Sequence, residues 1–480
     1  MTPTILFFVT IFLAFKARRA GESALKIMVM LWVLSGLTVV QMPALGGANI
    51  APAVLFLPFF LVYTIREVGW ESFFKSIYYP NAGFWLATLC LWGCLSAAFM
   101  PRIFEDAVQI ITTERSELGN GRILYIALRP ISGNITQAGY LIGGLLLFMC
   151  IVGMLHKAER QIYFMNSVLT LATVNCLLAI WNVAENYLGI FHILDIVRSI
   201  SAYKVLDPSS VLGLYRITGI FPEASVFALF TTPMFAYAFR LWLGKVQAKR
   251  TGIVAGTSFA LLILSTSSTA YAALGIYLLT LTIYKIAVGA SRLRGPTIGP
   301  VALISWLVLV CICMLALIKP GWLEAIFLYF DATLFNKGQS YSGIERASWN
   351  EQAWNNFIDT WGLGVGLGSA RASSFPLILL SNMGILGVGL FGAFLVSITY
   401  ASKADELLDN QRHAASAAGH AAVAALIAAS VSATVFDLGF PFYGLAAAAT
   451  AGAYGRRISG QKRRNRFSER PPGISVSVSK

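Results

Sequence analysis

Charged residues are scarce in this sequence: only 12% of the 480 residues are Asp, Glu, Lys or Arg, whereas 57% are hydrophobic. A soluble domain carries roughly 25% charged residues, because its surface has to be solvated. One membrane-spanning helix needs about 20 mostly apolar residues, and such stretches recur along the whole chain. The composition excludes a soluble enzyme and predicts an all-α, polytopic integral membrane protein.

Cysteine and histidine are also rare, which bears on metals and cofactors. The six cysteines all lie in apolar runs, without a CxxC spacing or a neighbouring histidine. They behave there as small hydrophobic residues, so the sequence supports neither a metal site nor a disulfide framework. We expect no metal and no cofactor.

Apolar runs separated by short polar connections predict about 12 to 13 transmembrane helices. The predicted ranges are 3–15, 24–42, 50–65, 82–99, 139–155, 162–187, 222–240, 251–265, 268–288, 297–318, 375–400, 421–436 and 441–455. The chain then divides into the first part of the bundle (1–318), a large loop (319–374), the last part of the bundle (375–455) and a basic tail (456–480), which we expect to be disordered.

The net charge of +14 comes from short clusters between the spans and in the tail, a pattern that does not indicate nucleic-acid binding. Basic residues stay on the cytoplasmic side during insertion. The clusters at 16–19, 156–160, 240–250 and 285–294 all fall on one side of the predicted spans, together with the tail. The N-terminus is therefore predicted outside the cytoplasm and the C-terminus inside.

Three long loops are predicted on the outer face, at 100–138, 188–221 and 319–374. In the third, residues 343–359 carry apolar side chains near helical spacing. We expect an amphipathic surface helix there, which either serves the site or merely covers the bundle.

Cationic side chains on the outer face oppose the positive-inside trend, so they are candidates for binding an anion. They are Arg198, Lys204, Arg216, Arg346 and Arg371. An arginine at the level of the lipid headgroups suits a phosphate or pyrophosphate, because its planar guanidinium makes bidentate bonds. The competing role for each is contact with phospholipid headgroups or with a carboxylate in the same loop.

A general base on the outer face is expected to be a carboxylate, because only one of the four histidines, His192, is predicted there. The main candidates are Glu223, which follows Pro222 at the mouth of a span, and Glu345. A purely structural role is also open to Glu223, because its charge favours the N-terminus of the following helix. Asp437 is a further candidate.

Four glycines alternate strictly at Gly362, Gly364, Gly366 and Gly368. The spacing is not that of a nucleotide-binding loop. An extended segment with one side free of side chains lets its backbone approach either a ligand or a helix.

Three segments together resemble the O-antigen polymerase and ligase superfamily of Wzy-like proteins. The first is RITGIFPEAS (216–225), which opens a span, and the second is STSSTAYAA (265–273) at a tight turn. The third runs from Arg346 through Trp349 and Trp354 to GLGVGLGS (362–369), and NMGILG (382–387) follows it.

The resemblance implies a bacterial inner-membrane glycosyltransferase of the GT-C type that acts on undecaprenyl-pyrophosphate-linked sugars at the periplasmic face. In that family, arginines of the two large periplasmic loops bind the lipid-linked substrates, and the matching positions here are Arg216 and Arg346, with Arg371 as a further one. The activity implied is inverting and metal-independent, with a polysaccharide chain-length regulator as the expected partner.

The ligase branch of that family carries a histidine after the glycine segment, whereas this chain reads ARASSFPLILLSNMG (370–384). The departure favours a polymerase of O-antigen or exopolysaccharide repeats over a ligase that transfers glycan to lipid A core. Two different classes of protein also fit the composition, namely a transporter of lipid-linked glycans and a membrane component without catalysis. Ionisable residues are few inside the predicted spans, which counts against ion-coupled transport.

Overall fold

The computed structural model describes residues 2–17, 21–42, 48–113, 123–189, 191, 193–198, 210–211, 214–289, 341–402 and 409–451. These residues form a helical bundle with three small antiparallel sheets. The α-helices are α1 (Ile5–Ala17), α2 (Gly21–Met30), α3 (Pro52–Val68), α4 (Trp70–Phe74), α5 (Ala82–Ile103), α6 (Ser132–Met154), α7 (Ala158–Leu188), α8 (Ile193–Arg198), α9 (Ala224–Leu243), α10 (Ala248–Leu264), α11 (Ser268–Gly289), α14 (Tyr341–Asp359), α15 (Phe375–Ser402), α16 (Asp409–Ser432) and a last helix at 439–451.

Short elements connect or cap these helices. Two 3-10 helices, η1 (Leu31–Leu34) and η3 (Lys75–Ile77), continue α2 and α4. The strands are β1 (Thr2–Pro3), β2 (Val40–Met42), β3 (Ala48–Ile50), β4 (Gln109–Thr113), β5 (Ile123–Ala127), β6 (Ser210–Val211) and β7 (Leu214–Tyr215). They pair in the orders β1-β2-β3, β4-β5 and β6-β7.

Six helices of the described residues are long and apolar enough to cross a membrane, so the protein is a helical multi-pass membrane protein. They are α5, α6, α7, α9, α15 and α16. A seventh crossing results if α3 and the segment Trp70–Ile77, bent by 114° from each other, count as one broken span. The predicted span 297–318 lies outside the described residues.

The structure corrects the predicted span 24–42. The helix ends at Leu34, and the chain then enters strand β2, where the Val39 amide donates to the Ile50 carbonyl (2.8 Å). The β-branched run Thr38, Val39 and Val40 favours this extended conformation. The predicted span 421–436 is also shifted, since α16 begins at Asp409 in an alanine-rich segment that strongly favours helix.

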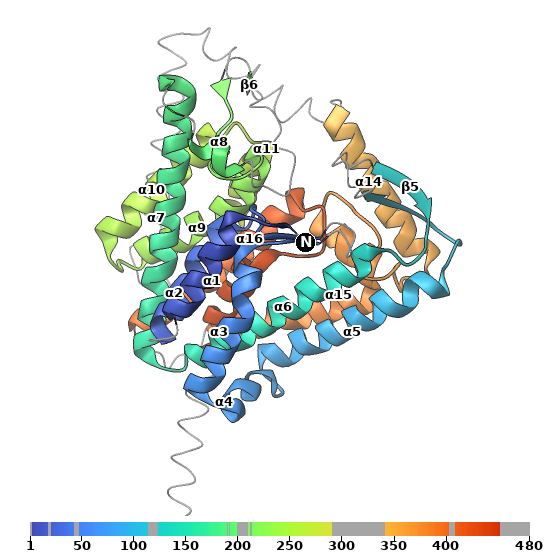
Figure 1. Ribbon diagram of the computed structural model, residues 1–480, viewed down its shortest axis with the longest axis horizontal. Helices are drawn as coiled ribbons and strands as arrows, with labels where there is room; N and C mark the ends of the chain where they lie inside the picture. The colour runs from blue at the N-terminus through green and yellow to red at the C-terminus, as the bar shows by residue number, and fades with distance from the viewer. Residues whose placement is uncertain are drawn as a thin grey trace, which may run out of the picture.

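Small residues allow the helices to pack closely in the core. A Cβ atom on Gly144 of α6 would lie 2.5 Å from the Tyr443 ring, and one on Gly444 would lie 2.4 Å from Trp32. Such close approach is typical of membrane helix interfaces. In Figure 1, α5, α6 and α15 run side by side, and α9 packs on α10 and α16.

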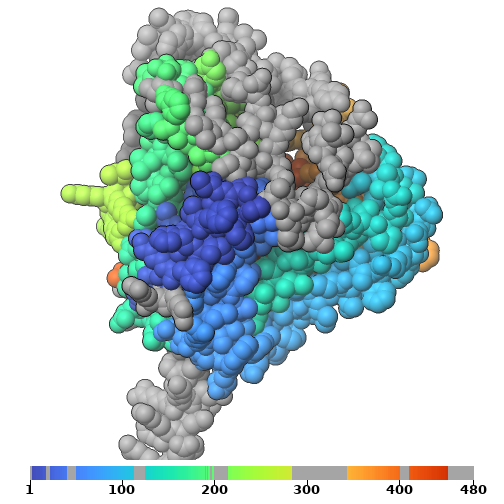
Figure 2. Space-filling view, viewed as in Figure 1, coloured from blue at the N-terminus to red at the C-terminus, as the bar shows by residue number. Residues whose placement is uncertain are grey.

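The outward side of α1 is apolar. Ile5, Phe8, Phe12 and Phe15 are each about two-thirds exposed, on a helix that lies at the surface seen in Figure 2. An exposed apolar face of this size on a bundle of spanning helices is suited to contact with lipid.

Candidate functional site

Four connections meet at one end of the bundle, which we call the loop face: residues 104–131 as far as they are described, 214–223, 360–374 and 433–438. The Arg371 amide donates to the Ile111 carbonyl (3.0 Å), and the Asp437 amide donates to Gln137 Oε1 (3.1 Å). The first bond joins 104–131 to 360–374, the second ties the 433–438 break to α6, and the Arg371 guanidinium, which donates to Thr434 Oγ1, joins 360–374 to that break. The fourth connection precedes α9, which packs against α16 in antiparallel orientation, so the start of α9 and the end of α16 lie at the same level.

The glycine segment is packed against its own protein. Every backbone amide from Gly362 to Arg371 donates to an acceptor within the chain. The side chain of Asn382 on α15 supplies two of these acceptor contacts, to Gly368 (3.0 Å) and Ala370 (3.2 Å), and its amide group donates to the Ala370 carbonyl (2.9 Å). The segment therefore presents no unused amides to an anion, and of the two interpretations of the alternating glycines, close approach to a helix is the one observed.

Glycine is required here by both conformation and space. All four alternating glycines have positive φ, between +78° and +97°. A Cβ atom on Gly368 would lie 2.3 Å from the Gly133 carbonyl oxygen, and one on Gly364 would lie 2.8 Å from the Gly384 amide. The alternation thus lets the segment lie directly on the start of α6 and on the kink of α15 at Gly384.

Arg371 leaves this segment at the centre of the loop face. Its guanidinium lies over the ring of Trp349 on α14, 5.7 Å from the ring centroid, and donates to Thr434 Oγ1 (2.9 Å) in the break after α16. The side chain is half-buried. An arginine held between an aromatic face and a hydroxyl is oriented without being neutralised by these two groups.

Helix α14 brings Arg346 and Glu345 to the same region. Trp349 lies under Arg371, and Asn350 Oδ1 accepts from the Ser373 amide (2.8 Å). Residues four apart share a helix face, so Glu345 lies one turn from Trp349 and Arg346 one turn from Asn350. Both Glu345 and Arg346 are half-buried.

The opposite side of α14 is exposed and carries large apolar side chains beside the polar residues Glu351 and Asn355. The exposed residues include Ile344, Trp354 and Ile358, followed by Trp361, whose side chain is 85% exposed. The Trp361 ring meets Phe104 edge to face just beyond α5. The surface helix expected over 343–359 is therefore present, and its apolar side continues the apolar surface of α5.

Arg198 and Arg216 belong to a second cluster, at the end of α7. Arg198 is buried and donates to the Gly219 carbonyl. Asn182 Oδ1 of α7 accepts from the amides of Thr218 (3.0 Å) and Gly219 (3.1 Å). Arg198 therefore fixes the loop that carries half-buried Arg216. In Figure 1, α8 with this cluster and α14 lie apart in the upper part of the view.

The remaining predicted residues are Glu223, Lys204 and His192. Glu223 is the N-cap residue of α9 and accepts a hydrogen bond from the Ser225 hydroxyl, so its charge lies at a helix N-terminus, as its structural role requires. Lys204 and His192 lie outside the described residues.

Asp437 lies in the 433–438 break, three residues after the Thr434 that contacts Arg371. Its carboxylate accepts from the Gly439 amide (3.0 Å). Burial raises the pKa of Asp437 to about 6, and the hydrogen bond from Gly439 opposes this rise. A carboxylate whose pKa is raised in this way is suited to proton transfer.

Sequence reasoning missed the polar residues that hold these segments in place. They are Asn134, Asn182, Trp349, Asn382 and Thr434. The signal for the asparagines was present, because Asn134, Asn182 and Asn382 are polar residues within apolar helices, where burial requires a hydrogen-bonding partner.

No protein-family model matches the chain, and no curated protein matches it.

Proposed function

We propose that this protein is a glycosyltransferase of a bacterial inner membrane, which polymerises undecaprenyl-pyrophosphate-linked oligosaccharide repeats of O-antigen or exopolysaccharide at the periplasmic face. The observation that carries the proposal is the meeting of α14, residues 371–373 and the 433–438 break at the loop face. This meeting brings two arginines and the Asp437 carboxylate, whose pKa is raised by burial, to one end of the bundle.

The cationic groups suit a pyrophosphate leaving group. When the bond between the sugar C1 atom and the pyrophosphate oxygen breaks, negative charge gathers on that oxygen. A guanidinium fixed in position stabilises this charge more in the transition state than in the ground state. In this proposal, Arg371 and Arg346 bind one lipid pyrophosphate, and Arg216, fixed through Asn182 and Arg198, binds the second lipid-linked chain.

The Asp437 carboxylate suits the attack by the acceptor sugar, because a base has to accept the proton of the attacking hydroxyl. A hydroxyl oxygen of the acceptor sugar forms a new bond to C1 from the side opposite the leaving group, which inverts the configuration. Its proton goes to the Asp437 carboxylate, and undecaprenyl pyrophosphate departs with the electron pair of the broken bond. Glu345, one turn from Trp349, is the second candidate to accept this proton.

The exposed side of α14 supports a substrate that stays in the bilayer. Trp354, Ile358 and Trp361 are exposed beside the apolar surface of α5. Tryptophan is enriched at the level of the lipid headgroups, where the pyrophosphate of a lipid-linked sugar also lies. Arg371, which contacts the other side of α14 at Trp349, would then lie at the same depth in the membrane as that pyrophosphate.

The test replaces the two arginines by lysine in the natural host and examines surface polysaccharide by gel. R371K and R346K keep the charge but lose the bidentate geometry, so we expect the ladder of polymer lengths to collapse to single repeats. R129K is the matched control, because Arg129 is exposed at the same face. Expression and thermal stability of each variant are measured in parallel.

A normal ladder in both lysine variants at normal expression would refute the proposal. Deletion of the gene distinguishes a polymerase from a ligase and from a transporter. Loss of the polymer with retention of single repeats indicates a polymerase, accumulation of lipid-linked polymer indicates a ligase, and retention of the substrate on the cytoplasmic side indicates a transporter.

A further inference from the structure

A cavity of about 390 Å³ opens at the end of the bundle opposite the loop face. It lies between the first turns of α7, the turn that joins α9 to α10, and the start of α16. One part of its wall is apolar, formed by Ile162, Met165 and Val246, and another part is polar, formed by Lys245, Gln247 and His413. The cavity is therefore amphipathic.

The turn between α9 and α10 holds its polar side chains in an unusual backbone conformation. Lys245 and Gln247 have φ values of +57° and +47°, although neither is glycine. The turn is fixed by hydrogen bonds from the Lys245 amide to the Trp242 carbonyl (2.9 Å) and from the Val246 amide to the Leu241 carbonyl (3.0 Å). Left-handed conformations are unfavourable for such residues, and strain of this kind is often associated with function.

Lys245 gives the wall of the cavity a positive charge. Among the described residues, no carboxylate forms an ion pair with Lys245. The neighbouring Arg250 donates to Thr170 Oγ1 (3.0 Å) and to Asn166 Oδ1 (3.5 Å), which are neutral groups.

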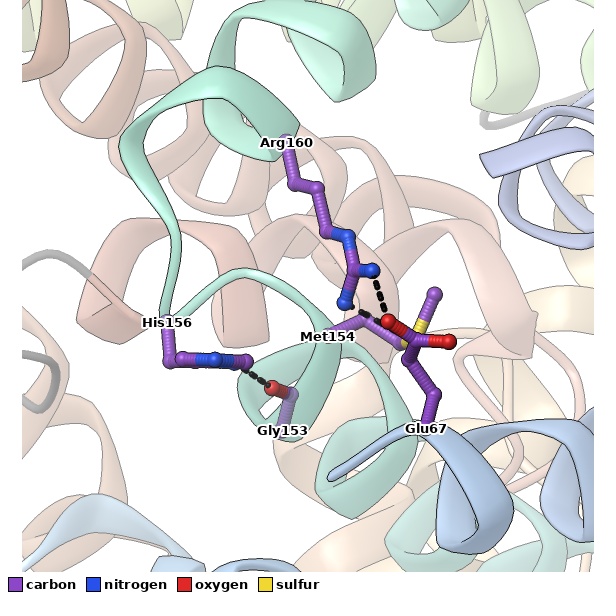
Figure 3. A network of polar contacts seen from close by, with 5 residues as sticks. All are labelled: Glu67, Gly153, Met154, His156 and Arg160. Atoms are coloured by element: carbon purple, nitrogen blue, oxygen red, sulfur yellow. Dashed lines mark hydrogen bonds and ion pairs between the residues drawn. The ribbon is translucent and has the colours of Figure 1, made fainter. Parts of the chain in front are cut away.

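The α6–α7 turn, at the same end of the bundle, shows the opposite arrangement. Figure 3 shows Arg160 paired with Glu67 of α3, and the same guanidinium contacts Met154 Sδ. His156 bonds to the Gly153 carbonyl (2.7 Å) in the turn. The charge of Arg160 is thus compensated within the protein, whereas the described part of the chain offers Lys245 no such carboxylate.

We propose that this cavity binds the headgroup of an anionic phospholipid from the adjacent leaflet. The phosphate lies against Lys245 and Gln247, and the glycerol and first acyl carbons lie along Ile162, Met165 and Val246. A free phosphate would not use the apolar wall, whereas a phospholipid uses both parts. Basic pockets between membrane helices are suited to such headgroups. This inference does not depend on the proposed glycosyltransferase activity.

The test measures lipid retention by the full-length protein in nanodiscs of phosphatidylglycerol and phosphatidylcholine, followed by native mass spectrometry. We expect the wild-type protein to retain phosphatidylglycerol selectively and K245Q to retain about fivefold less. K249Q is the matched control, because Lys249 is exposed on the first turn of α10 but does not line the cavity. It should retain as much lipid as the wild type.

A second variant separates lipid binding from folding. K245G removes the charge and also relieves the positive φ, so it should keep or raise the melting temperature while losing retention. Equal losses in K245Q and K249Q would overturn the proposal in favour of non-specific attraction. Displacement of the lipid by saturating inorganic phosphate, with an equal gain in melting temperature, would overturn it in favour of a free anion.

Discussion

The two arginine clusters of the loop face are built alike but use their arginines differently. At the end of α7, Asn182 accepts two loop amides and Arg198 donates to the Gly219 carbonyl. At α15, Asn382 accepts two loop amides, but Arg371 extends onto the Trp349 ring and the Thr434 hydroxyl. An arginine at this face can therefore fix its own loop or extend onto a neighbouring segment, and a backbone carbonyl within reach favours the first role.

The largest expected effect comes from the glycine segment, which the α7 cluster lacks. G368A would place a methyl group 2.3 Å from the Gly133 carbonyl oxygen, at a φ of +84°. The neighbouring atom belongs to the backbone of Gly133, so it cannot move aside as a flexible side chain could. We therefore expect a loss of about 4 kcal/mol or more of stability. Detergent extraction followed by size-exclusion chromatography should show little folded protein.

G389A is the control for this substitution. Gly389 lies in the same helix as Asn382, and a Cβ atom there meets nothing within 4 Å. The control should extract normally. Similar yields of the two variants would contradict the packing of the glycine segment.

The next largest losses of stability are expected on replacing the two anchoring asparagines, Asn382 and Asn182. N382A leaves the Gly368 and Ala370 amides without their acceptor, which should cost about 2–4 kcal/mol. N182A also releases two amides, but Arg198 still holds the Gly219 carbonyl, so about 1–2 kcal/mol is expected. Melting temperatures in one detergent should rank N382A below N182A, with exposed Asn355 as the site of the control N355A. The reverse ranking would show that the α7 cluster is the more tightly fixed.

Much of the helical architecture could be predicted from local sequence. The apolar run at 82–99 lies within α5, and the amphipathic spacing at 343–359 lies within α14. The gap at 437–440 between the last two predicted spans overlaps the observed break at 433–438. The 24–42 run was mistaken for one span, because hydropathy alone does not distinguish a buried strand from a helix.

The candidate site was predictable only in part. Arg346 and Arg371 were chosen because the sequence predicts them on the outer face, but the role of Arg198 depends on a carbonyl 21 residues away. The anchoring of Gly368 and Ala370 by Asn382 likewise depends on how the chain folds back on itself. Such contacts are tertiary, so neither spacing nor composition could reveal them.

The last effect on stability concerns Asp437 in the 433–438 break. Its pKa is raised from 3.8 to about 6 by burial, so the folded state disfavours the charged form. The wild-type protein therefore loses stability as the pH rises from about 4 to about 6, and the loss is complete above that range. D437N stays neutral and keeps an oxygen that can accept from the Gly439 amide. It should melt a few degrees higher than the wild type at pH 7.5, and the difference should vanish near pH 4.

The same variant should lose polymer formation if Asp437 accepts the proton of the attacking hydroxyl. A gain in stability with a loss of activity is the pattern expected when a functional group lowers the stability of the folded state. The loop face would then consist of two similar scaffolds of which only one carries a reactive carboxylate. A D437N variant that is more stable and fully active would leave Asp437 as a structural residue and transfer the role of base to Glu345.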